Sequence, residues 1–377
     1  MRDAVIVDAV RTPIGRRNGA LSGFHPARLS AHALSALAER NGLDPLTVDD
    51  VIWGCVSQVG EQSGNIARIA ALAARWPETV PGTTVTRACG SSQQAVSFAA
   101  ATVISGQNDV VVAGGVEAMS RVPMGSAGTI LGQSYPTEVT HRYGVDQFSQ
   151  GVGAEMVAEK WSLSRTELDE YALRSHALAA AAADSGAFDR QMVPTDTLSQ
   201  DEGIRRNGSL ETLANLKPVF REDGVIHAGN SSQISDGSGA LLITTSEYAA
   251  KQGWKPIVRV HTAVALGDDP LIMLTAPIAA TAKALSRAGL TVDDIGAFEI
   301  NEAFAPVPLA WQKETGATMD RLNPLGGAIA VGHPLGGSGA VLMTRLVHHM
   351  RDNEIRYGLQ SMCEAGGMAN ATILELL

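Results

Sequence analysis

The sequence predicts an α/β protein in which one α/β unit occurs twice, with an unmatched segment between the copies. Residues 33–51 (ALSALAERNGLDPLTVDDV) and 282–295 (AKALSRAGLTVDDI) each indicate an amphipathic helix that ends at Gly-Leu, followed by Thr-Val-Asp-Asp and a strand. Residues 109–120 and 359–373 each indicate a strand, an Ala-Gly-Gly turn and a second strand. The offset is about 250 residues in both comparisons, and two matches in the same order favour a duplication over chance.

The first copy contains a cysteine where a strand is expected to turn into a helix. After an opening strand in MRDAVIVDAVRTPIG, residues 83–86 alternate like a short strand and residues 91–101 predict a helix of small residues. Cys89 lies at the joint, beside Gly90, as a tight turn and a helix start require. A thiol there faces the amide dipoles of a helix N-terminus, which lower its pKa and favour the nucleophilic thiolate. The alternative is a buried structural cysteine.

The second copy has a histidine at the corresponding place. Adding the offset to Cys89 leads to residues 332–347 (GHPLGGSGAVLMTRLV), another glycine-rich turn into a helix, which contains His333. If a pseudo-twofold axis relates the copies, the two helix starts face each other. A thiol beside an imidazole is the arrangement that activates a cysteine nucleophile. The alternative for His333 is a polar surface or capping residue.

The segment between the copies, residues 120–232, has no counterpart. It contains a loop-like stretch rich in Gly, Ser and Pro (121–140) and a helical stretch with good helix starts at Ser162 and Ser164. Residues 201–221 are charged and loop-rich, with basic residues at Arg205, Arg206, Lys217 and Arg221. These cations indicate either a solvated face or a basic patch for an anionic ligand, and both interpretations stay open at this point.

Composition and missing motifs exclude several classes of protein. A net charge of −10 over 377 residues argues against a nucleic-acid binder. Three cysteines without CxxC spacing indicate neither a zinc site nor a disulfide framework, and they fit a reducing cytoplasm. We expect no leader, because the chain opens directly on a strand-like run, and no membrane span, because no apolar stretch is long enough. GxGxxG, GxxxxGK[ST], GxSxG and HExxH are absent, which argues against dinucleotide-binding, P-loop, serine-hydrolase and zinc-protease sites.

Seven segments in order resemble the thiolase family, the acetyl-CoA acyltransferases, nearly from end to end. They are VRTPIGRRNGALS near the start, CGSSQQA from Cys89, AGGVEAMSR (113–121), AGNSSQISDGSGALL (228–242), INEAFAPV (300–307), NPLGGAIAVGHPLGGSG (323–339) and CEAGGMANATI (363–373). Together, at spacings typical of the family, they are far more specific than any one of them alone.

The resemblance implies a fold and a set of ligands. It implies two similar βαβαβαββ halves packed as five layers, with a loop domain inserted after the first half. The expected domains are residues 1–119, completed by about 233–257, then an inserted coenzyme A-binding loop domain at 120–232, and the second half at 258–377. Coenzyme A and acetyl-CoA are the expected substrates, with no tightly bound cofactor and no metal. A homodimer or a homotetramer is expected.

The resemblance also implies residue roles at the matched positions. Cys89 resembles the nucleophile that takes the acyl group, and His333 the base that activates it. Cys363 resembles the second cysteine, which moves the proton at the α-carbon of acetyl-CoA. Asn301 resembles the residue that holds a water, which with His333 stabilises the enolate oxygen. Further expected contacts are an oxyanion site from the backbone N–H groups of Cys89 and Ala365, a pantetheine contact at Ser232, and a nucleotide-binding surface along 201–221 with Arg205, Arg206, Lys217 and Arg221.

Departures from the family narrow the expected reaction. Many biosynthetic members carry a histidine where this chain has Ser149, so we expect a thiolase that cleaves 3-oxoacyl-CoA. Ala365 replaces the usual glycine two places after the second cysteine, which could alter the second oxyanion site slightly. The alternatives are a biosynthetic acetoacetyl-CoA thiolase, a condensing enzyme like ketoacyl synthases, and a catalytically silent acyl-CoA-binding protein. Cys363 argues against the condensing enzyme, and the intact set with Asn301 argues against the silent protein. The sequence leaves the acyl chain open.

Overall fold

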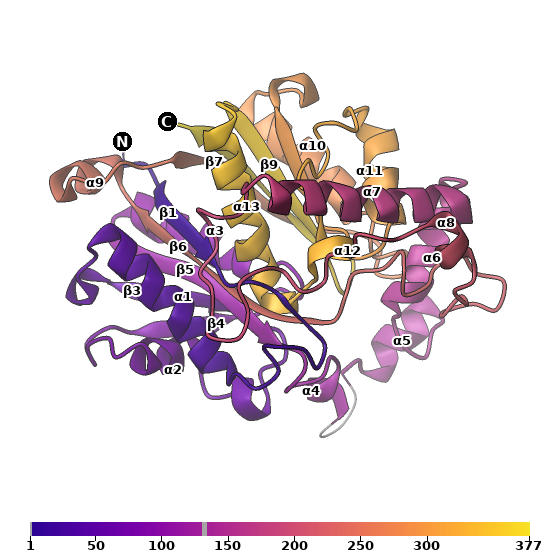
Figure 1. Ribbon diagram of the computed structural model, residues 1–377, viewed down its shortest axis with the longest axis horizontal. Coiled ribbons are helices and arrows are strands. Elements are labelled where there is room, and N and C mark those ends of the chain that lie inside the picture. Colours follow the sequence, from indigo (N-terminus) through magenta and orange to yellow (C-terminus); the bar gives the residue numbers. More distant parts are fainter. Residues whose placement is uncertain (1, 130–133) are drawn as a thin grey trace.

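The computed structural model describes residues 2–129 and 134–377, and its strands form one mixed sheet (Figure 1). The strands of the first half, in spatial order, are β4 (Gly82–Val85), β3 (Asp50–Gly54), β5 (Val110–Ala118), β6 (Ser235–Thr244) and β1 (Val5–Arg11). Those of the second half follow as β7 (Val258–Gly267), β10 (Met368–Leu376), β9 (Tyr357–Glu364) and β8 (Ala297–Ile300). The short β2 (Gly15–Arg16) pairs with β6.

The two halves have the same topology, which confirms the predicted duplication. In both, two parallel strands (β3 with β5, β8 with β9) are followed by two antiparallel pairings that end at β1 or β7. Where the first half has β4 beside β3, the second has an isolated parallel bridge between Phe298 and Leu322. The halves join where β1 pairs with β7 over two residue pairs, Val5 with Arg259 and Ile6 with Val258.

The two half-sheets and the helices on their faces form the five layers expected of the fold. Their order is helices, half-sheet, helices, half-sheet, helices. α1 (Pro26–Asn41) and α2 (Ile66–Ala73) cover the outer face of the first half. α10 (Ala276–Ala288) and α11 (Pro306–Thr315) cover the outer face of the second half. Between the halves lie α3 (Ser91–Ser105) and α13 (Ser338–Asp352), which contact each other and both half-sheets (Figure 1).

The middle layer explains why α3 consists largely of small residues. Val96 and Ala99 of α3 pack with Met343 and Leu346 of α13 in one buried cluster between the half-sheets. The two helices approach so closely that a Cβ on Gly339 would lie 2.3 Å from the backbone nitrogen of Gln93. A side chain there would separate the helices, so the small residues bring the starts of α3 and α13 together.

The described part of the segment between the halves adds five helices, α4 (Ser126–Thr129), α5 (Thr137–Tyr143), α6 (Gln150–Lys160), α7 (Arg165–Asp184) and α8 (Leu210–Ala214). The predicted start at Ser164 is confirmed, because Ser164 and Glu167 form a capping box at the start of α7. The predicted start at Ser162 is wrong: this residue has a positive φ of 50° in the turn before α7. Residues 130–133 of the expected loop 121–140 lie outside the described residues.

A buried ion pair ties this segment to the sheet. Arg11, at the end of β1, forms two hydrogen bonds of 2.7 and 2.9 Å with the carboxylate of Asp201, and both side chains are fully buried. Gln191 accepts a further hydrogen bond from Arg11, and Asp201 accepts one from the backbone of Ile14. Charges buried at this depth are stable only when paired, so this contact fixes the segment in place.

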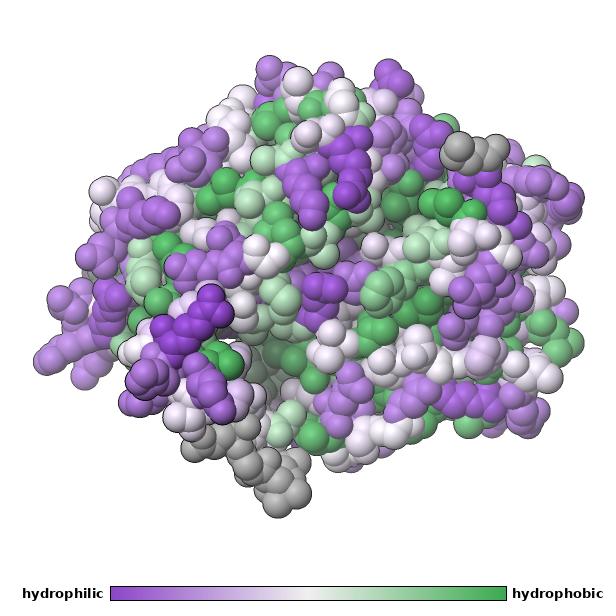
Figure 2. Space-filling model, turned by 180° about the vertical axis from the view of Figure 1, so that it is seen from behind, coloured by the Kyte–Doolittle hydropathy of each residue, from purple (hydrophilic) through white to green (hydrophobic). Residues whose placement is uncertain are grey.

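Two more helices complete the chain, α9 (Ser246–Gln252) between the halves and α12 (Ala328–Val331) before α13. Both ends of the chain lie at the same side of the molecule (Figure 1). On the face seen from behind, hydrophobic residues reach the surface in patches between hydrophilic ones (Figure 2). In the described part of the chain, no helix combines the length and the apolar character needed to cross a membrane.

Candidate active site

Cys89 lies in a tight turn between β4 and α3 and is 3% exposed. The residue before it, Ala88, has a positive φ of 45°, a conformation that costs a residue with a side chain about 1 to 2 kcal/mol. Ser91 holds the turn closed, because its hydroxyl accepts from the backbone N–H of Arg87 at 2.9 Å and donates to the carbonyl of Ala88 at 2.6 Å. The chain therefore places the thiol at the start of α3 in one defined position.

His333 precedes α13, and its hydrogen bonds define which ring nitrogen carries the proton. Nδ1 lies 2.6 Å from the hydroxyl oxygen of Ser338. That hydroxyl donates its single proton to the carbonyl of Pro334 at 2.9 Å, so Nδ1 must be the donor toward Ser338. Nε2 is then unprotonated, and it is buried without a hydrogen-bond partner among the described residues. Burial lowers the pKa of His333 to about 4, so the ring is neutral and its Nε2 can accept a proton.

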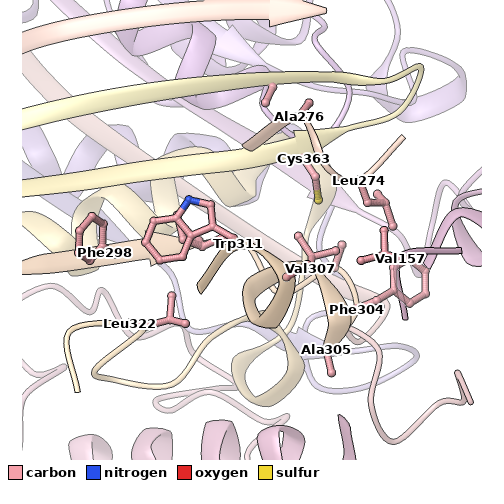
Figure 3. Close-up of a cluster of buried hydrophobic side chains, with 14 of the residues drawn as sticks. Val157, Leu274, Ala276, Phe298, Phe304, Ala305, Val307, Trp311, Leu322 and Cys363 are labelled. Atoms are coloured by element: carbon pink, nitrogen blue, oxygen red, sulfur yellow. The ribbon is translucent and has the colours of Figure 1, made fainter. Parts of the chain in front are cut away.

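Cys363 is the last residue but one of β9 and is 1% exposed. Its thiol lies at the edge of the core of the second half, near Leu274 and Val307 (Figure 3). It is close enough to Cys89 for the two thiols to interact electrostatically. The side chain of Asn301, which follows β8, interacts with the Cys363 thiol and opposes the rise in its pKa.

Asn301 is held by its backbone rather than by its amide group. Its N–H donates to the carbonyl of Ser361 at 3.1 Å. Both polar atoms of its buried side chain lack a hydrogen bond of standard geometry among the described residues. Buried amides are usually fully hydrogen-bonded, so this group is available to a ligand or an ordered water.

The electrostatics correct the expectation of a lowered Cys89 pKa. Burial raises the pKa of Cys89 to about 12, and the charges of Glu364 and Glu117 add to the rise. A hydrogen bond from Gln150 and the residue's own N–H only partly oppose it. Burial and the Cys89 thiol also raise the pKa of Cys363. The resting site thus holds neutral thiols and a neutral imidazole, and Cys89 requires a base at the moment of attack.

A cavity of about 230 Å³ reaches His333. His333 and Ser232, for which the resemblance implies the base and the pantetheine contact, both line it. Met119 and Leu335 line the cavity and also pack against Cys89, so they connect the cavity with the nucleophile. The remaining lining residues are Met124, Gln150, Val219, Phe220, His227, Ala228, Ser231, Gln233, Ile234, Ala303 and Phe304. The wall is mainly apolar, with polar groups from Gln150 and the 231–233 stretch.

The structure separates the four expected basic contacts. Arg205 and Arg206 line a second cavity, of about 330 Å³, which shares no lining residue with the first. Arg206 is paired with Asp184 at 2.6 Å. Lys217 is exposed, and the half-buried Arg221 pairs with Glu159; these two flank Val219 and Phe220, which line the first cavity.

The structure shows where the two departures from the family pattern, Ser149 and Ala365, lie. Ser149 caps α6 by accepting from the N–H of Val152 at 3.4 Å, while its neighbour Gln150 lines the cavity. Ala365 begins the three-residue turn between β9 and β10 and is half-buried. The sequence motifs did not single out Gln150, Ser338 or Glu364. Ser338 could have been found from its place at the start of α13, five residues after His333.

Comparisons with known proteins agree with this geometry. Residues 4–247 match the family model described as "Thiolase, N-terminal domain", and residues 254–376 match "Thiolase, C-terminal domain". The chain belongs to the thiolase family. The family resemblance, the fold and the assignment as an acyltransferase are thereby confirmed.

Named relatives and a solved structure cover this thiolase over its whole length. A steroid 3-ketoacyl-CoA thiolase of Mycobacterium tuberculosis is 49% identical, covering 100% of this chain and 95% of its own. A beta-ketoadipyl-CoA thiolase of Escherichia coli is 41% identical, covering 100% of both chains. The crystal structure of the Bacillus anthracis acetyl-CoA acetyltransferase superposes with a TM-score of 0.92 at 38% identity, covering 100% of this chain and 99% of that one.

Proposed function

We propose that this thiolase cleaves 3-oxoacyl-CoA with coenzyme A to acetyl-CoA and a shortened acyl-CoA, through an acyl group carried on Cys89. The observation that carries the proposal is a pair of interacting buried thiols beside a cavity that His333 lines, with the Nε2 of that imidazole free to accept a proton. A condensing enzyme with one cysteine would have no use for Cys363. Relatives named as 3-ketoacyl-CoA thiolases support the thiolytic direction.

In the first half-reaction Cys89 attacks the 3-oxo carbon while His333 Nε2 takes the thiol proton. Because the thiol is neutral at rest, proton transfer and attack occur together. The bond between carbons 2 and 3 then breaks, leaving the acyl group on Cys89 and acetyl-CoA as its enolate. Cys363 donates its proton to the α-carbon, and Asn301 and His333 stabilise the enolate oxygen.

In the second half-reaction the thiol of coenzyme A attacks the thioester on Cys89. After the first half-reaction His333 carries the proton of Cys89 and Cys363 is a thiolate, so His333 passes that proton to Cys363 and both groups are restored. His333 Nε2 then accepts the proton of coenzyme A and gives it to the Cys89 sulfur as that sulfur leaves. The backbone N–H of Cys89, which faces its own sulfur, and that of Ala365 are the proposed donors to the thioester oxygen. Thioesters suit this exchange because sulfur both attacks and leaves readily.

Coenzyme A and the acyl group would share the cavity that Ser232 lines. We propose that Ser232 contacts the pantetheine, and that Lys217 and Arg221 meet the phosphates at its rim, next to the lining residues Val219 and Phe220. Arg205 and Arg206, in the second cavity, stay a prediction as nucleotide contacts. In this proposal residues 120–232 form the inserted domain that binds coenzyme A, between the halves at 1–119 with 233–257 and at 258–377.

The assembly and compartment complete the proposal. The outer edge of β4 is unpaired within the described chain, and α2 and α3, which both contact β4, expose Leu72 and Phe98, each 44% exposed. We propose that this face joins two copies in a homodimer, alone or as half of a tetramer. The two catalytic thiols must stay reduced, which supports a cytoplasmic location.

The acyl group is proposed to be larger than acetoacetyl. The cavity wall is mainly apolar and a 49% identical relative is named for a steroid substrate. We expect thiolysis of at least one bulky 3-oxoacyl-CoA ester to have a higher kcat/KM than thiolysis of acetoacetyl-CoA. A panel of esters of increasing bulk measures this, and acetoacetyl-CoA as the best substrate would contradict it.

The two cysteines can be tested separately. Cys363→Ala should still form an acetyl adduct on Cys89, visible by intact mass after mixing with acetyl-CoA, because acyl transfer requires Cys89 and His333. It should fail to exchange the α-protons of acetyl-CoA with deuterated water, since loss of a general base costs about a hundredfold to ten-thousandfold. Cys89→Ala should form no adduct.

The matched control is Cys55→Ala. Cys55 is the third buried cysteine and packs in the outer core of the first half, so its loss should leave both readouts intact. Near wild-type proton exchange in Cys363→Ala would refute the role of the second cysteine. An adduct on Cys89→Ala would refute the nucleophile.

A further inference from the structure

Glu364 is a buried carboxyl group placed directly against the turn that carries the nucleophile. It is the last residue of β9, next to Cys363, and its side chain is fully buried. A Cβ on Gly90 would lie 2.0 Å from Oε1 of Glu364, so the carboxyl group rests on the Cα of the residue after Cys89. Neither carboxyl oxygen has a hydrogen bond of standard geometry among the described residues.

Few groups face this carboxyl group. Arg87, half-buried in the loop before Cys89, is the cation that acts on it. Asn370 on β10 directs its backbone N–H toward it and donates from its side chain to the carbonyl of Gly90 at 3.1 Å. The neighbouring thiols are Cys89 and Cys363, which the charge of Glu364 affects.

The charge state of Glu364 depends on burial. Burial raises its pKa to about 8, against the opposing effects of Arg87 and the N–H of Asn370. The group is therefore an uncharged acid at neutral pH and a carboxylate in mild alkali. As a carboxylate it raises the pKa of the Cys89 thiol. From the first half, Glu117 acts on Cys89 in the same sense.

We propose that Glu364 is a positioning residue that supports the Cys89 turn as a neutral carboxylic acid, and that its ionisation suppresses acyl transfer to Cys89. This inference deepens the proposed function and rests on it for the acyl-transfer step. As the proton leaves, acyl transfer develops negative charge on the sulfur of Cys89 and on the oxygen beside its N–H. A carboxylate against Gly90 opposes both charges, whereas a neutral acid opposes neither.

His333 and Cys89, which exchange the proton in acyl transfer, have no transition of their own in this pH range. His333 is neutral above about pH 5, because its pKa is lowered to about 4. The Cys89 thiol itself ionises only near pH 12. A loss of acyl transfer between pH 7 and pH 9.5 that disappears in Glu364→Gln is therefore assigned to Glu364.

The test compares wild type with Glu364→Gln, which keeps the shape and removes the ionisation. The initial rate of Cys89 acetylation by acetyl-CoA is followed by intact mass from pH 6.5 to pH 9.5. We expect the ratio of the variant rate to the wild-type rate to rise from about one at pH 6.5 to about tenfold at pH 9.5. Asp50→Asn is the control, a carboxyl with a raised pKa at the far end of β3, and its ratio should not depend on pH.

A second readout requires no acyl transfer. The alkylation of Cys89 by iodoacetamide depends on the thiolate, so its rate ratio between Glu364→Gln and wild type should rise with pH in the same way. If wild type forms no acetyl adduct but the alkylation ratio rises, the proposed function fails and the link between Glu364 and Cys89 stands. A ratio that is constant with pH in both readouts overturns the inference and leaves the proposed function intact.

Arg87→Gln provides an independent variant if Glu364→Gln does not fold. Removing this cation takes away a group that favours the carboxylate, so the pKa of Glu364 should rise. The onset of the alkaline loss in acetylation should then move to a higher pH than in wild type. An unchanged onset, or a move to lower pH, overturns the inference.

Discussion

His333 owes its role to a short chain of hydrogen bonds rather than to its charge. The hydroxyl of Ser338 is committed to the carbonyl of Pro334, which makes it an acceptor for Nδ1–H. Ser338→Ala removes that acceptor and allows the ring to place its proton on Nε2. We expect Cys89 acetylation to slow by about tenfold to a hundredfold, less than the loss of the base itself. Thermal melting should show a folded variant, and a wild-type acetylation rate would contradict the tautomer assignment.

The lowered pKa of His333 also sets the acid limit of the reaction. Below about pH 4 the ring is protonated and cannot act as a base, whereas a solvent-exposed histidine would lose this capacity near pH 6.5. We expect kcat/KM for thiolysis to be kept at pH 5.5 and to fall only below about pH 5. A pH profile with its acid limb at pH 6.5 would contradict the burial of this ring.

Two buried histidines make the free energy of unfolding depend on pH between about pH 4 and pH 6.5. His333 and His176 both have pKa values lowered to about 4 by burial. Between pH 4 and pH 6.5 the unfolded chain binds more protons, so stability is complete above pH 6.5 and falls as the pH decreases through 4. We expect the urea midpoint to fall over this range, and less so in His176→Gln. A midpoint that does not change from pH 7 to pH 4.5 would refute this expectation.

Single residues show what the sequence could and could not predict about the site. The motifs singled out Cys89, His333, Asn301 and Cys363, and all four are buried in the structure. Cys363 interacts with Cys89 and Asn301, and His333 lines the cavity whose wall packs against Cys89. The predicted thiolate at Cys89 is wrong, because the pKa of the thiol depends on two features that the local sequence does not contain. They are burial between two half-sheets and the nearby Glu364, about 275 positions away in the chain. Local sequence contains the helix start, but not what packs over it.

At the scale of elements, Glu117 of β5 joins the two halves of the site. Its carboxylate accepts from the N–H groups of Val56, Ser57 and Gly336 at 2.8 to 3.0 Å. Gly336 belongs to the short turn between His333 and α13, while the other two follow β3. A carboxylate from one half thus fixes the turn that orients the histidine of the other half.

We expect Glu117→Ala to cost about 3 kcal/mol or more, because these three N–H groups and the buried side-chain amide of Gln62 all lose this acceptor. Acetylation of Cys89 should fall as well, since the turn that positions His333 is released. Glu117→Gln keeps one oxygen acceptor and should be intermediate in both measures. Urea unfolding and intact mass give the two values, and Glu117→Ala with wild-type stability would contradict this role.

The duplication made many helices and strands predictable from the sequence. The elements that differ between the two halves are determined by tertiary contacts instead. The repeat correctly predicted helices before β3 and β8, and a turn between paired strands at residues 365–367. The matching turn expected at residues 113–115 is wrong, because these residues lie inside the continuous strand β5. Two similar halves would include a second-half strand equivalent to β4, but the structure has a single bridge between Phe298 and Leu322 in that place. This contact depends on packing in the second half, which the repeat does not contain. Ser164 was predictable from its capping box, whereas Ser162 lies in the turn before it.

For the whole molecule, the unpaired edge of the sheet at β4 is the feature that indicates an interface with a second copy. Edge strands are normally shielded, and β4 is flanked by helices that expose apolar residues. The net charge of −10 does not prevent self-association through such a face, because apolar burial is local while charge repulsion is screened. In the first half, Leu72 of α2 and Phe98 of α3 are the large apolar side chains to test.

Leu72→Asp combined with Phe98→Asp should convert the assembled protein into a smaller species, since each carboxylate would be buried without a partner in the interface. Light scattering after size exclusion measures the mass, with the wild type expected at two or four copies of the 39.4 kDa chain. Leu46→Asp is the control, because Leu46 is 64% exposed in the turn after α1, away from β4, and should leave the mass unchanged. A wild type at the mass of one chain, or a double variant at the wild-type mass, would show that this face is not the interface.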